Sequence, residues 1–427
     1  MRFIDESDNW NLFKLGEVLD KKGYIRGPFG SALKRGEMKK EGIPVYEQQH
    51  AIYNNRIFRY YIDNDKFQEL KRFQVFPNDL IVSCSGTIGK TSLITNNDEK
   101  GIISQALLIL RSNPNIINPK FLKYFLETNS GYNSLISSAG GSSQVNIAKK
   151  QIILDIPLLV PNLETQSKII SFLDLINNKI ELLEEKHKYY QDFKKYLMQK
   201  LFAQELRFDD NCHYKTKKVK DFLTESKIEG TDDINKRLTV KLNLKGITVR
   251  ESKTIEKEGA TKQFIRKSGQ FIYGKQNLHK GAFGIVPKEL DGYLSSSDIP
   301  SFDFKGEIEP KWFYYYFSRK SFYESLESLS TGTGSKRISP KEFLNIKLIV
   351  PELKEQHRIV CLFAKVDEEI NGISNQILQM NRFKKSLLQQ MFVVRINWRC
   401  NFKLAKSPSF NKHLLILKNK IIFIIIK

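Results

Sequence analysis

The sequence predicts an α+β protein in which two globular domains alternate with two long helices that pair within the chain. Three observations support this prediction. One segment recurs at an offset of 190 residues, each copy of it has a coiled-coil pattern, and the positive charge is concentrated in blocks separated by near-neutral segments. Together they indicate a duplicated architecture.

The internal repeat is clearest between residues 160–202 and 350–392. These two segments align without a gap, and 12 of their 43 positions are identical. Self-similarity at a fixed offset indicates a duplicated structural unit. The repeat also extends upstream, since Asn118-Pro119 and Glu309-Pro310 each precede an aromatic-rich stretch. The predicted order is therefore globular, helix, globular, helix.

Each copy of the repeat has apolar residues at alternating steps of four and three, which is the coiled-coil pattern. The pattern covers residues 169–201 and 359–391, so each helix would be on the order of 50 Å long. The one glycine in either run, Gly372, costs only ~1 kcal/mol. Because residues 152–208 carry no net charge, we expect the helices to pair with each other rather than bind DNA. The predicted seam consists of Ile169, Leu173, Ile176, Ile180 and Leu183 in the first helix, and Ile359, Phe363, Val366, Ile370, Ile373 and Ile377 in the second.

The globular segments are predicted to be α+β domains. Their centres, Val82–Thr95 and Phe271–Pro287, have short apolar runs broken by glycine and polar turns, which is typical of strands. The predicted boundaries are 1–151 and 209–345 for the globular domains, 152–208 and 346–392 for the helical regions, and 393–427 for a basic and apolar tail.

Length and composition exclude several classes of protein. A chain of 427 residues exceeds one ordinary hydrophobic core, so at least two domains are expected. The four cysteines and six histidines are scattered, so neither a disulfide framework nor a metal site is predicted. The polar and acidic segment Met1–Trp10 is unlike a signal peptide, which favours a cytoplasmic protein that does not contact membranes.

Positive charge is the strongest compositional signal. The net charge is +22, of which each predicted globular domain carries +6 and the tail +8. The helical regions carry zero and +2. Two basic blocks favour a nucleic-acid partner, while the alternative is a genome that uses lysine freely.

No segment has the pattern of a catalytic site. Residues 86–91 resemble a phosphate-binding P-loop, but the required first glycine falls at Cys84. The Gly332–Lys336 turn fails the same test, and Asp63 with Glu69-Leu-Lys71 is too common a pattern to indicate a nuclease. The chain also lacks the Asn-Pro-Pro-Tyr motif of DNA methyltransferases and a glycine-rich loop for S-adenosylmethionine. No catalytic or metal-ligating residue is therefore predicted.

A set of motifs occurs twice in the same order over about residues 10–392. This arrangement resembles the specificity subunits of type I restriction–modification systems. No single motif is specific, but their ordered repetition is. In the first half, the motifs are Pro28-Phe29-Gly30-Ser31 with Lys34, Ser85-Gly86-Thr87-Ile88-Gly89-Lys90, and Pro161 with Gln166 at the start of the long helix. In the second half, they are Tyr273–Gly281, Gly284–Pro287, Pro351 with Gln356 at the start of the long helix, and Lys384-Lys385.

The resemblance implies a role for each part of the chain. The globular domains would be target-recognition domains, each binding one half of a split target in double-stranded DNA. The helices would pack antiparallel, as a ruler between them. The subunit would recruit methyltransferase subunits and, through them, restriction subunits. It would use no cofactor itself, because S-adenosylmethionine, ATP and Mg²⁺ would be bound by those partners.

Residues that contact DNA are predicted on exposed turns of both globular domains. Phosphates are contacted by Lys and Arg, and base edges by Gln, Asn, Arg, Ser and Thr. Neighbouring glycines such as Gly86 and Gly89 let backbone N–H groups approach a phosphate. For each residue, the alternative is a solvated surface side chain. The predicted residues are Lys34, Arg35, Gln48, Ser85, Thr87, Lys90, Gln144 and Asn146 in the first domain, and Lys275, Asn277, His279, Lys280, Ser335, Lys336 and Arg337 in the second.

Three other functions share some of these features. The specificity subunit of a type IIB-like system would have the same architecture. A self-contained nuclease or modification enzyme and a coiled-coil adaptor without DNA function are the remaining alternatives. The tail 393–427 departs from the family pattern, and a read-through or frameshifted end explains its composition better than a functional arm.

Overall fold

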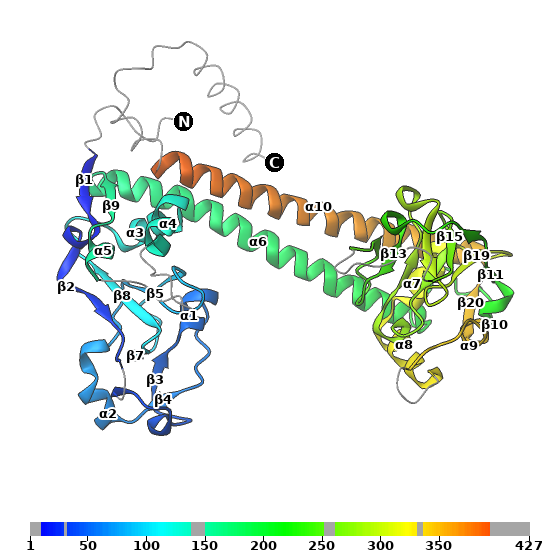
Figure 1. Cartoon of the computed structure of the whole chain (residues 1–427), viewed down its shortest axis with the longest axis horizontal. Coiled ribbons are helices and arrows are strands. Elements are labelled where there is room, and N and C mark those ends of the chain that lie inside the picture. The colour runs from blue at the N-terminus through cyan, green and yellow to red at the C-terminus, as the bar shows by residue number, and fades with distance from the viewer. Residues whose placement is uncertain (1–9, 30–31, 138–149, 252–260, 331–335, 393–427) are drawn as a thin grey trace, which may run out of the picture. The chain divides into compact units, whose positions relative to one another are not determined.

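The computed structural model describes residues 10–29, 32–137, 150–251, 261–330 and 336–392. The described residues form two compact units, one within residues 10–182 and 376–392 and the other within residues 183–375 (Figure 1). Each unit thus combines a globular part with a portion of both long helices. The predicted tail lies outside the described residues.

The first unit is built on a four-stranded antiparallel sheet in the order β2 (Leu19–Arg26), β8 (Leu107–Ser112), β5 (Asp79–Ser83) and β6 (Thr91–Leu93). Successive side chains of β5 point to opposite faces. Leu80 and Val82 therefore enter one core, and Ile81 enters another. The second core lies against the sheet of β4 (Tyr61–Ile62), β3 (Ile43–Tyr46) and β7 (Ile102–Ile103).

The remaining elements of the first unit close the globular part around these sheets. Strand β1 (Asn11–Lys14) pairs antiparallel with β9 (Pro157–Val160), which brings the two ends of this part together. Helix α3 begins where the Asn118 side chain caps the Lys120 N–H at 2.9 Å, and it buries Phe121 and Phe125. The helices are α1 (Gln48–Tyr53), α2 (Asn64–Glu69), α3 (Pro119–Glu127), α4 (Asn129–Ser137) and α5 (Lys150–Leu154).

The second unit repeats this plan. Its four-stranded antiparallel sheet has the order β11 (Leu223–Ser226), β19 (Ser301–Phe304), β16 (Phe271–Tyr273) and β17 (Phe283–Ile285). Strand β10 (Tyr214–Lys218) pairs with β20 (Lys347–Pro351), as β1 pairs with β9. The duplication therefore extends into the domain centres, where the sequences do not align.

The second unit also has elements of its own. One is a three-stranded sheet in the order β12 (Glu229–Gly230), β15 (Gln263–Arg266) and β18 (Tyr293–Ser296). Another is the hairpin of β13 (Leu238–Val240) and β14 (Ile247–Val249). Its short helices are α7 (Pro310–Phe317), α8 (Lys320–Ser325) and α9 (Pro340–Leu344). The mixed helix and strand content agrees with the predicted α+β class.

The two long helices are α6 (Leu163–Phe202) and α10 (Leu353–Phe392), each 40 residues long. Each begins six residues before the predicted range, because a helix starts at its cap and not at its first seam residue. In α6 the cap is Asn162, whose side-chain oxygen accepts from the Thr165 N–H at 2.8 Å.

Within each unit, the early turns of one long helix pack against the late turns of the other. The predicted seam residues are buried, except Ile370 and Ile377, which are half-buried. The contacting residues are Ile169, Leu173, Leu388 and Met391 in the first unit, and Leu197, Leu201, Ile359 and Phe363 in the second.

The last residue of each long helix packs on a short helix rich in aromatic residues, which is α3 in the first unit and α7 in the second. The ring of Phe392 lies 5.1 Å from that of Phe121 in α3. The ring of Phe202 lies 5.4 Å from that of Tyr316 and 6.0 Å from that of Trp312, both in α7. Each globular part is thus closed by the end of the helix that belongs to the other half of the sequence.

Candidate nucleic-acid interface

The two four-stranded sheets present equivalent loops at the same end. In the first sheet, β2 and β5 end where β8 and β6 begin. In the second sheet, β11 and β16 end where β19 and β17 begin. The β5–β6 loop (residues 84–90) and the β16–β17 loop (residues 274–282) therefore occupy corresponding places. These loops carry seven of the residues predicted to contact DNA.

In the first unit, the structure brings Gln48, Ser85 and Thr87 together. The Gln48 amide, at the start of α1, donates to the backbone carbonyls of Ser85 and Thr87, at 3.1 Å for the latter. Between these carbonyls, Gly86 has a φ of +61°, a backbone conformation that favours glycine. Gln48 therefore holds the β5–β6 loop in place, and the exposed Thr87 hydroxyl is free to face a ligand.

The start of α1 is itself fixed by a buried histidine. The His50 Nδ1 accepts from the Glu47 N–H at 2.7 Å, and its Nε2 lies 3.1 Å from the Ile57 carbonyl. Burial lowers the pKa of His50, so the ring stays neutral near pH 7. Its Nδ1 can therefore accept the hydrogen bond from the Glu47 N–H. Gln48 is thus held by a rigid local network.

Lys90 ends the β5–β6 loop and borders a basic groove. Its side chain is exposed, with Nζ 5.5 Å from the centre of the Tyr132 ring. The groove has a volume of about 520 Å³ and is also lined by Lys384 and Lys385 of α10. Lys384 is partly neutralised by Glu127 at 3.7 Å. The structure thus places two further lysines beside a predicted one.

The other predicted residues of the first domain are not joined to this loop. Lys34 and Arg35 are exposed at the start of a single turn of 3₁₀ helix (Arg35–Glu37), where the Lys34 N–H donates to the Glu37 carboxylate at 3.0 Å. In the described part of the chain, no hydrogen bond or ion pair links them to the β5–β6 loop. Gln144 and Asn146 lie outside the described residues.

In the second unit, the structure brings Lys275 and Arg337 together around Asp298. The Lys275 N–H donates to the Asp298 carbonyl at 2.9 Å, and the Arg337 guanidinium donates to the Asp298 carboxylate at 3.2 Å. The Lys275 carbonyl in turn accepts from the Ile338 N–H at 2.9 Å. Lys275 and Arg337, which are 62 residues apart in the sequence, therefore lie on one surface. Ser335 lies outside the described residues.

The rest of the β16–β17 loop separates into buried and exposed positions. His279 is only 8% exposed, and burial lowers its pKa. Lys280 is exposed and Asn277 is half-buried, while the exposed Lys336 pairs with Glu327 at 2.9 Å. A neutral, buried His279 would position the loop more readily than bind a phosphate. Its predicted DNA contact stays a prediction, as do those of the other residues.

One element at this end of the second sheet was not predicted from the sequence. The tip of the β13–β14 hairpin, residues 241–246, is hydrogen-bonded to the β16–β17 loop. Its segment Leu242-Asn243-Leu244-Lys245-Gly246, between two short apolar runs, is a hairpin signal that could have been recognised. Its position beside Lys280 could not have been recognised from the sequence, because the two segments are distant in the sequence.

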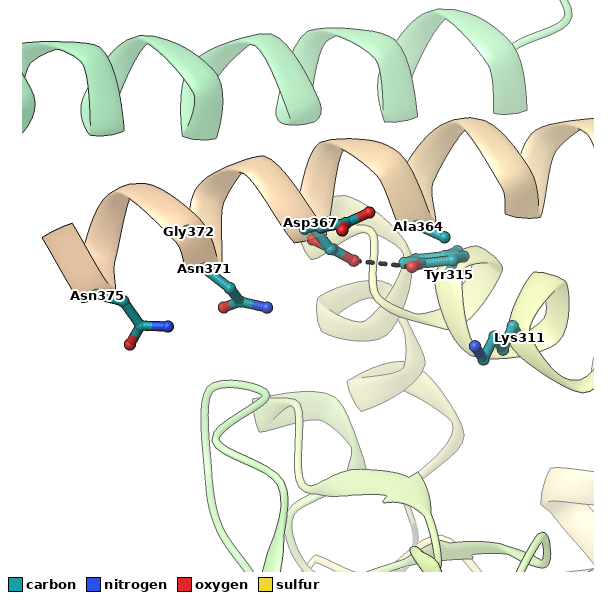
Figure 2. Close-up of a pocket in the computed structure, with 8 residues that line it drawn as sticks. Lys311, Tyr315, Ala364, Asp367, Asn371, Gly372 and Asn375 are labelled. Atoms are coloured by element: carbon teal, nitrogen blue, oxygen red, sulfur yellow. Dashed lines mark hydrogen bonds between the residues drawn. The ribbon is translucent and has the colours of Figure 1, made fainter. Parts of the chain in front are cut away.

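A pocket of about 530 Å³ lies between α7 and α10 in the second unit. Figure 2 shows Tyr315 of α7 joined to Asp367 of α10, while Lys311 of α7 lines the same pocket on the far side of Tyr315. The Tyr315 hydroxyl donates to the Asp367 carboxylate at 2.8 Å. Burial and this hydrogen bond raise the pKa of Tyr315. The tyrosine therefore stays protonated and joins the two helices.

The first unit has an equivalent pocket between α3 and α6, with a volume of about 480 Å³. Its Tyr124 hydroxyl donates to Asp174 at 2.5 Å, and Lys120 forms an ion pair with the same carboxylate at 2.9 Å. Lys120 and Tyr124 correspond to Lys311 and Tyr315 at an offset of 191 residues. Each unit therefore carries one copy of this surface.

The described residues contain neither a cluster of metal ligands nor a membrane-spanning helix. Nowhere in this part of the chain do three or more His, Cys, Asp or Glu side chains gather as metal ligands would. None of its helices has both the length and the apolar character needed to cross a membrane.

Known proteins resemble this chain over most of its length. A family model described as "Type I restriction modification DNA specificity domain" matches residues 7–189 and again residues 207–380. The type I restriction enzyme MjaVIII specificity subunit of Methanocaldococcus jannaschii is 22% identical over 417 residues, which cover 91% of this chain and 93% of that protein.

Two solved structures have a similar fold. One is the S subunit of a type I restriction–modification system from M. genitalium, with a TM-score of 0.54 at 14% identity over 91% of this chain and 97% of that one. The other is a chain from a structure titled for complex assembly and conformational transition of the type I system. Its TM-score is 0.53 at 14% identity, over 90% of this chain and 98% of that one.

Proposed function

Because the chain belongs to the family of type I restriction–modification DNA specificity domains, we propose that it is the DNA sequence-recognition subunit of such a complex. The observation that supports the proposal is that both units have a loop of the same kind at the same end of a similar sheet. Each unit presents, at the same end of an equivalent four-stranded sheet, a loop with exposed basic and polar residues. One chain would therefore offer two similar but non-identical DNA-binding surfaces.

The two surfaces would bind the two halves of a split, asymmetric target. Their loops have different sequences, Cys84–Lys90 in one unit and Gly274–Ala282 in the other, so each would select different bases. The bases between the half-sites would face no recognition loop and would be left unread.

A single antiparallel coiled coil of α6 and α10 would set the distance between the half-sites. The support comes from each unit separately, since in both of them the early turns of one helix pack on the late turns of the other. A continuous seam would join these two contacts. Because α6 has 40 residues, the rod would be about 60 Å long.

The chain would have no catalytic activity of its own. Methylation would come from methyltransferase subunits that bind S-adenosylmethionine, and cleavage from restriction subunits that use ATP and Mg²⁺. The duplicated Lys–Tyr–carboxylate pockets at the aromatic helices support recruitment of a partner in two copies, one on each unit. We propose these pockets and the adjacent helix faces as docking surfaces for the methyltransferase subunits.

The proposal predicts that sequence-specific methylation depends on this chain. Methyltransferase subunits incubated with genomic DNA and S-adenosylmethionine should modify a gapped motif when the chain is present. Without it they should show no sequence preference. Single-molecule sequencing of the treated DNA makes this comparison. Methylation of the same motif without the chain would contradict the proposal, and so would nuclease or methyltransferase activity of the purified chain alone.

A further inference from the structure

The tip of the β13–β14 hairpin is attached to the β16–β17 loop. The Asn243 N–H donates to the Lys280 carbonyl and the Leu244 N–H to the Gly281 carbonyl, both at 2.9 Å. The turn itself is closed by a hydrogen bond of 2.9 Å from the Lys241 N–H to the Gly246 carbonyl. The tip is therefore held beside the loop that carries the predicted contact Lys280.

The backbone of the tip is strained. Asn243 and Leu244 have φ values of +57° and +58°, although neither is a glycine. Two consecutive residues in this region are unfavourable for L-amino acids, and leucine tolerates it less well than asparagine. Such strain persists only where the surrounding structure holds it, and it is concentrated at functional sites.

The body of the hairpin supplies the support for the strained tip. Leu238 is buried with Ile272 and Val286, and Ile247 packs against the same cluster. The contact with β17 is close, because a Cβ atom on Gly284 would lie 3.2 Å from the Ile247 side chain. The apolar face of the hairpin is thus anchored on the sheet, and its tip projects at the end where the loops lie.

The tip displays unneutralised charge and a free amide. Lys241, Asn243 and Lys245 are all exposed. Within the described residues, neither Lys241 nor Lys245 has a carboxylate at ion-pair distance, unlike Lys336, which pairs with Glu327. The Asn243 side chain likewise makes no hydrogen bond to any described residue. These are the groups that DNA recognition uses, since lysine binds phosphates and asparagine binds base edges.

We propose that the tip Lys241–Gly246 is a specificity-determining element of the second unit. The tip of a two-stranded ribbon fits the major groove of B-DNA. There the Asn243 amide would bind an adenine, accepting from its N6 and donating to its N7, and Lys241 and Lys245 would bind the flanking phosphates. This inference rests on the proposed DNA-recognition function and adds to it the residue that selects one base.

The decisive variant is Asn243→Gly in the full chain, assembled with its methyltransferase subunits. Glycine adopts the left-handed conformation without strain, so the turn persists while the amide is removed. We expect the methylated motif to lose selectivity at one A·T position of one half-site, by about 5- to 150-fold, and to stay unchanged elsewhere. Asn78→Gly is the matched control, because Asn78 is exposed with a φ of +73° in the first unit, beyond the other end of β5. Its motif should equal that of the wild type.

The charge of the tip is tested by Lys241→Ala combined with Lys245→Ala. Each lost phosphate contact should reduce the magnitude of the slope of log affinity against log salt concentration by about 0.9. The slope of the double variant should therefore be smaller by about 1.8, and its methylated motif should be unchanged. The control pair Lys288→Ala and Lys305→Ala removes two exposed lysines at the opposite end of the same sheet, and it should keep the wild-type slope.

The outcomes separate this inference from the proposed function. If wild type gives a gapped motif and folded Asn243→Gly methylates it with undiminished selectivity at every position, the inference is overturned and the proposed function stands. If wild type itself directs no motif, both are overturned. Near-UV circular dichroism of each variant establishes that it is folded.

Discussion

Substitution of Phe392 by alanine is expected to lower the free energy of unfolding of the first unit by about 3–5 kcal/mol, the usual cost of removing a buried phenylalanine. Phe392 is 4% exposed and packs on Phe121 and Phe125 of α3, at ring distances of 5.1 and 6.2 Å. Because about 270 residues separate it from α3, this contact exists only if the end of α10 returns to the first globular part.

Hydrogen–deuterium exchange measured by mass spectrometry locates this effect. Phe392→Ala should accelerate exchange in α3, and Phe202→Ala should accelerate it in α7, where Phe202 contacts Trp312 and Tyr316. Phe193→Ala is the control, since its side chain is 37% exposed on α6. Faster exchange in α7 for the Phe392 variant would show that the helix ends are assigned to the wrong globular parts.

Substitution of Gln166 by leucine is expected to destabilise the first unit by about 3 kcal/mol or more. The Gln166 side chain is fully buried and makes three hydrogen bonds to backbone. Its Oε1 accepts from the Asn118 N–H at 2.7 Å, and its Nε2 donates to the carbonyls of Ile116 at 2.9 Å and Pro161 at 2.8 Å. Leucine would leave these three buried groups unpaired, at about 1–3 kcal/mol for each.

Thermal and denaturant unfolding measure this loss. Gln356→Leu should have the same effect on the second unit, because Gln356 accepts from the Glu309 N–H at 2.8 Å and donates to the Pro351 carbonyl at 2.9 Å. Gln191→Leu, on the exposed face of α6, is the matched control and should change stability by less than about 0.5 kcal/mol. An equal loss for Gln191→Leu would mean that helix propensity, and not the buried bonds, controls the result.

The parts of the fold that sequence alone predicted are those encoded by local periodicity. Both long helices follow from apolar steps of four and three. Only the first six residues and the last residue of each were missed, because the helix begins at a cap that precedes the seam, which is Asn162 in α6. The matching strand order of the two sheets could not be predicted, since strands of three to eight residues in the two domain centres share no alignable sequence.

The candidate site was predictable as a set of loops but not as a set of side-chain roles. Gln48 was predicted to face DNA, yet its amide donates to the backbone of the β5–β6 loop, a contact set by residues 37 to 39 positions away. His279 lies in the predicted loop but is buried by its surroundings. The hairpin tip around Asn243 was missed because its importance comes from a contact with Lys280 that only the tertiary structure creates.

The central claim is that each globular domain recognises one half of a split DNA target independently of the other. It is tested most directly by replacing residues 209–345 with the corresponding segment of a specificity subunit that has a different known target. The methylated motif is then sequenced in cells that express the hybrid with its methyltransferase subunits. We predict a hybrid motif in which one half and the spacer length are retained and the other half is that of the donor. A motif changed in both halves, or one identical to that of the wild type, would contradict the account.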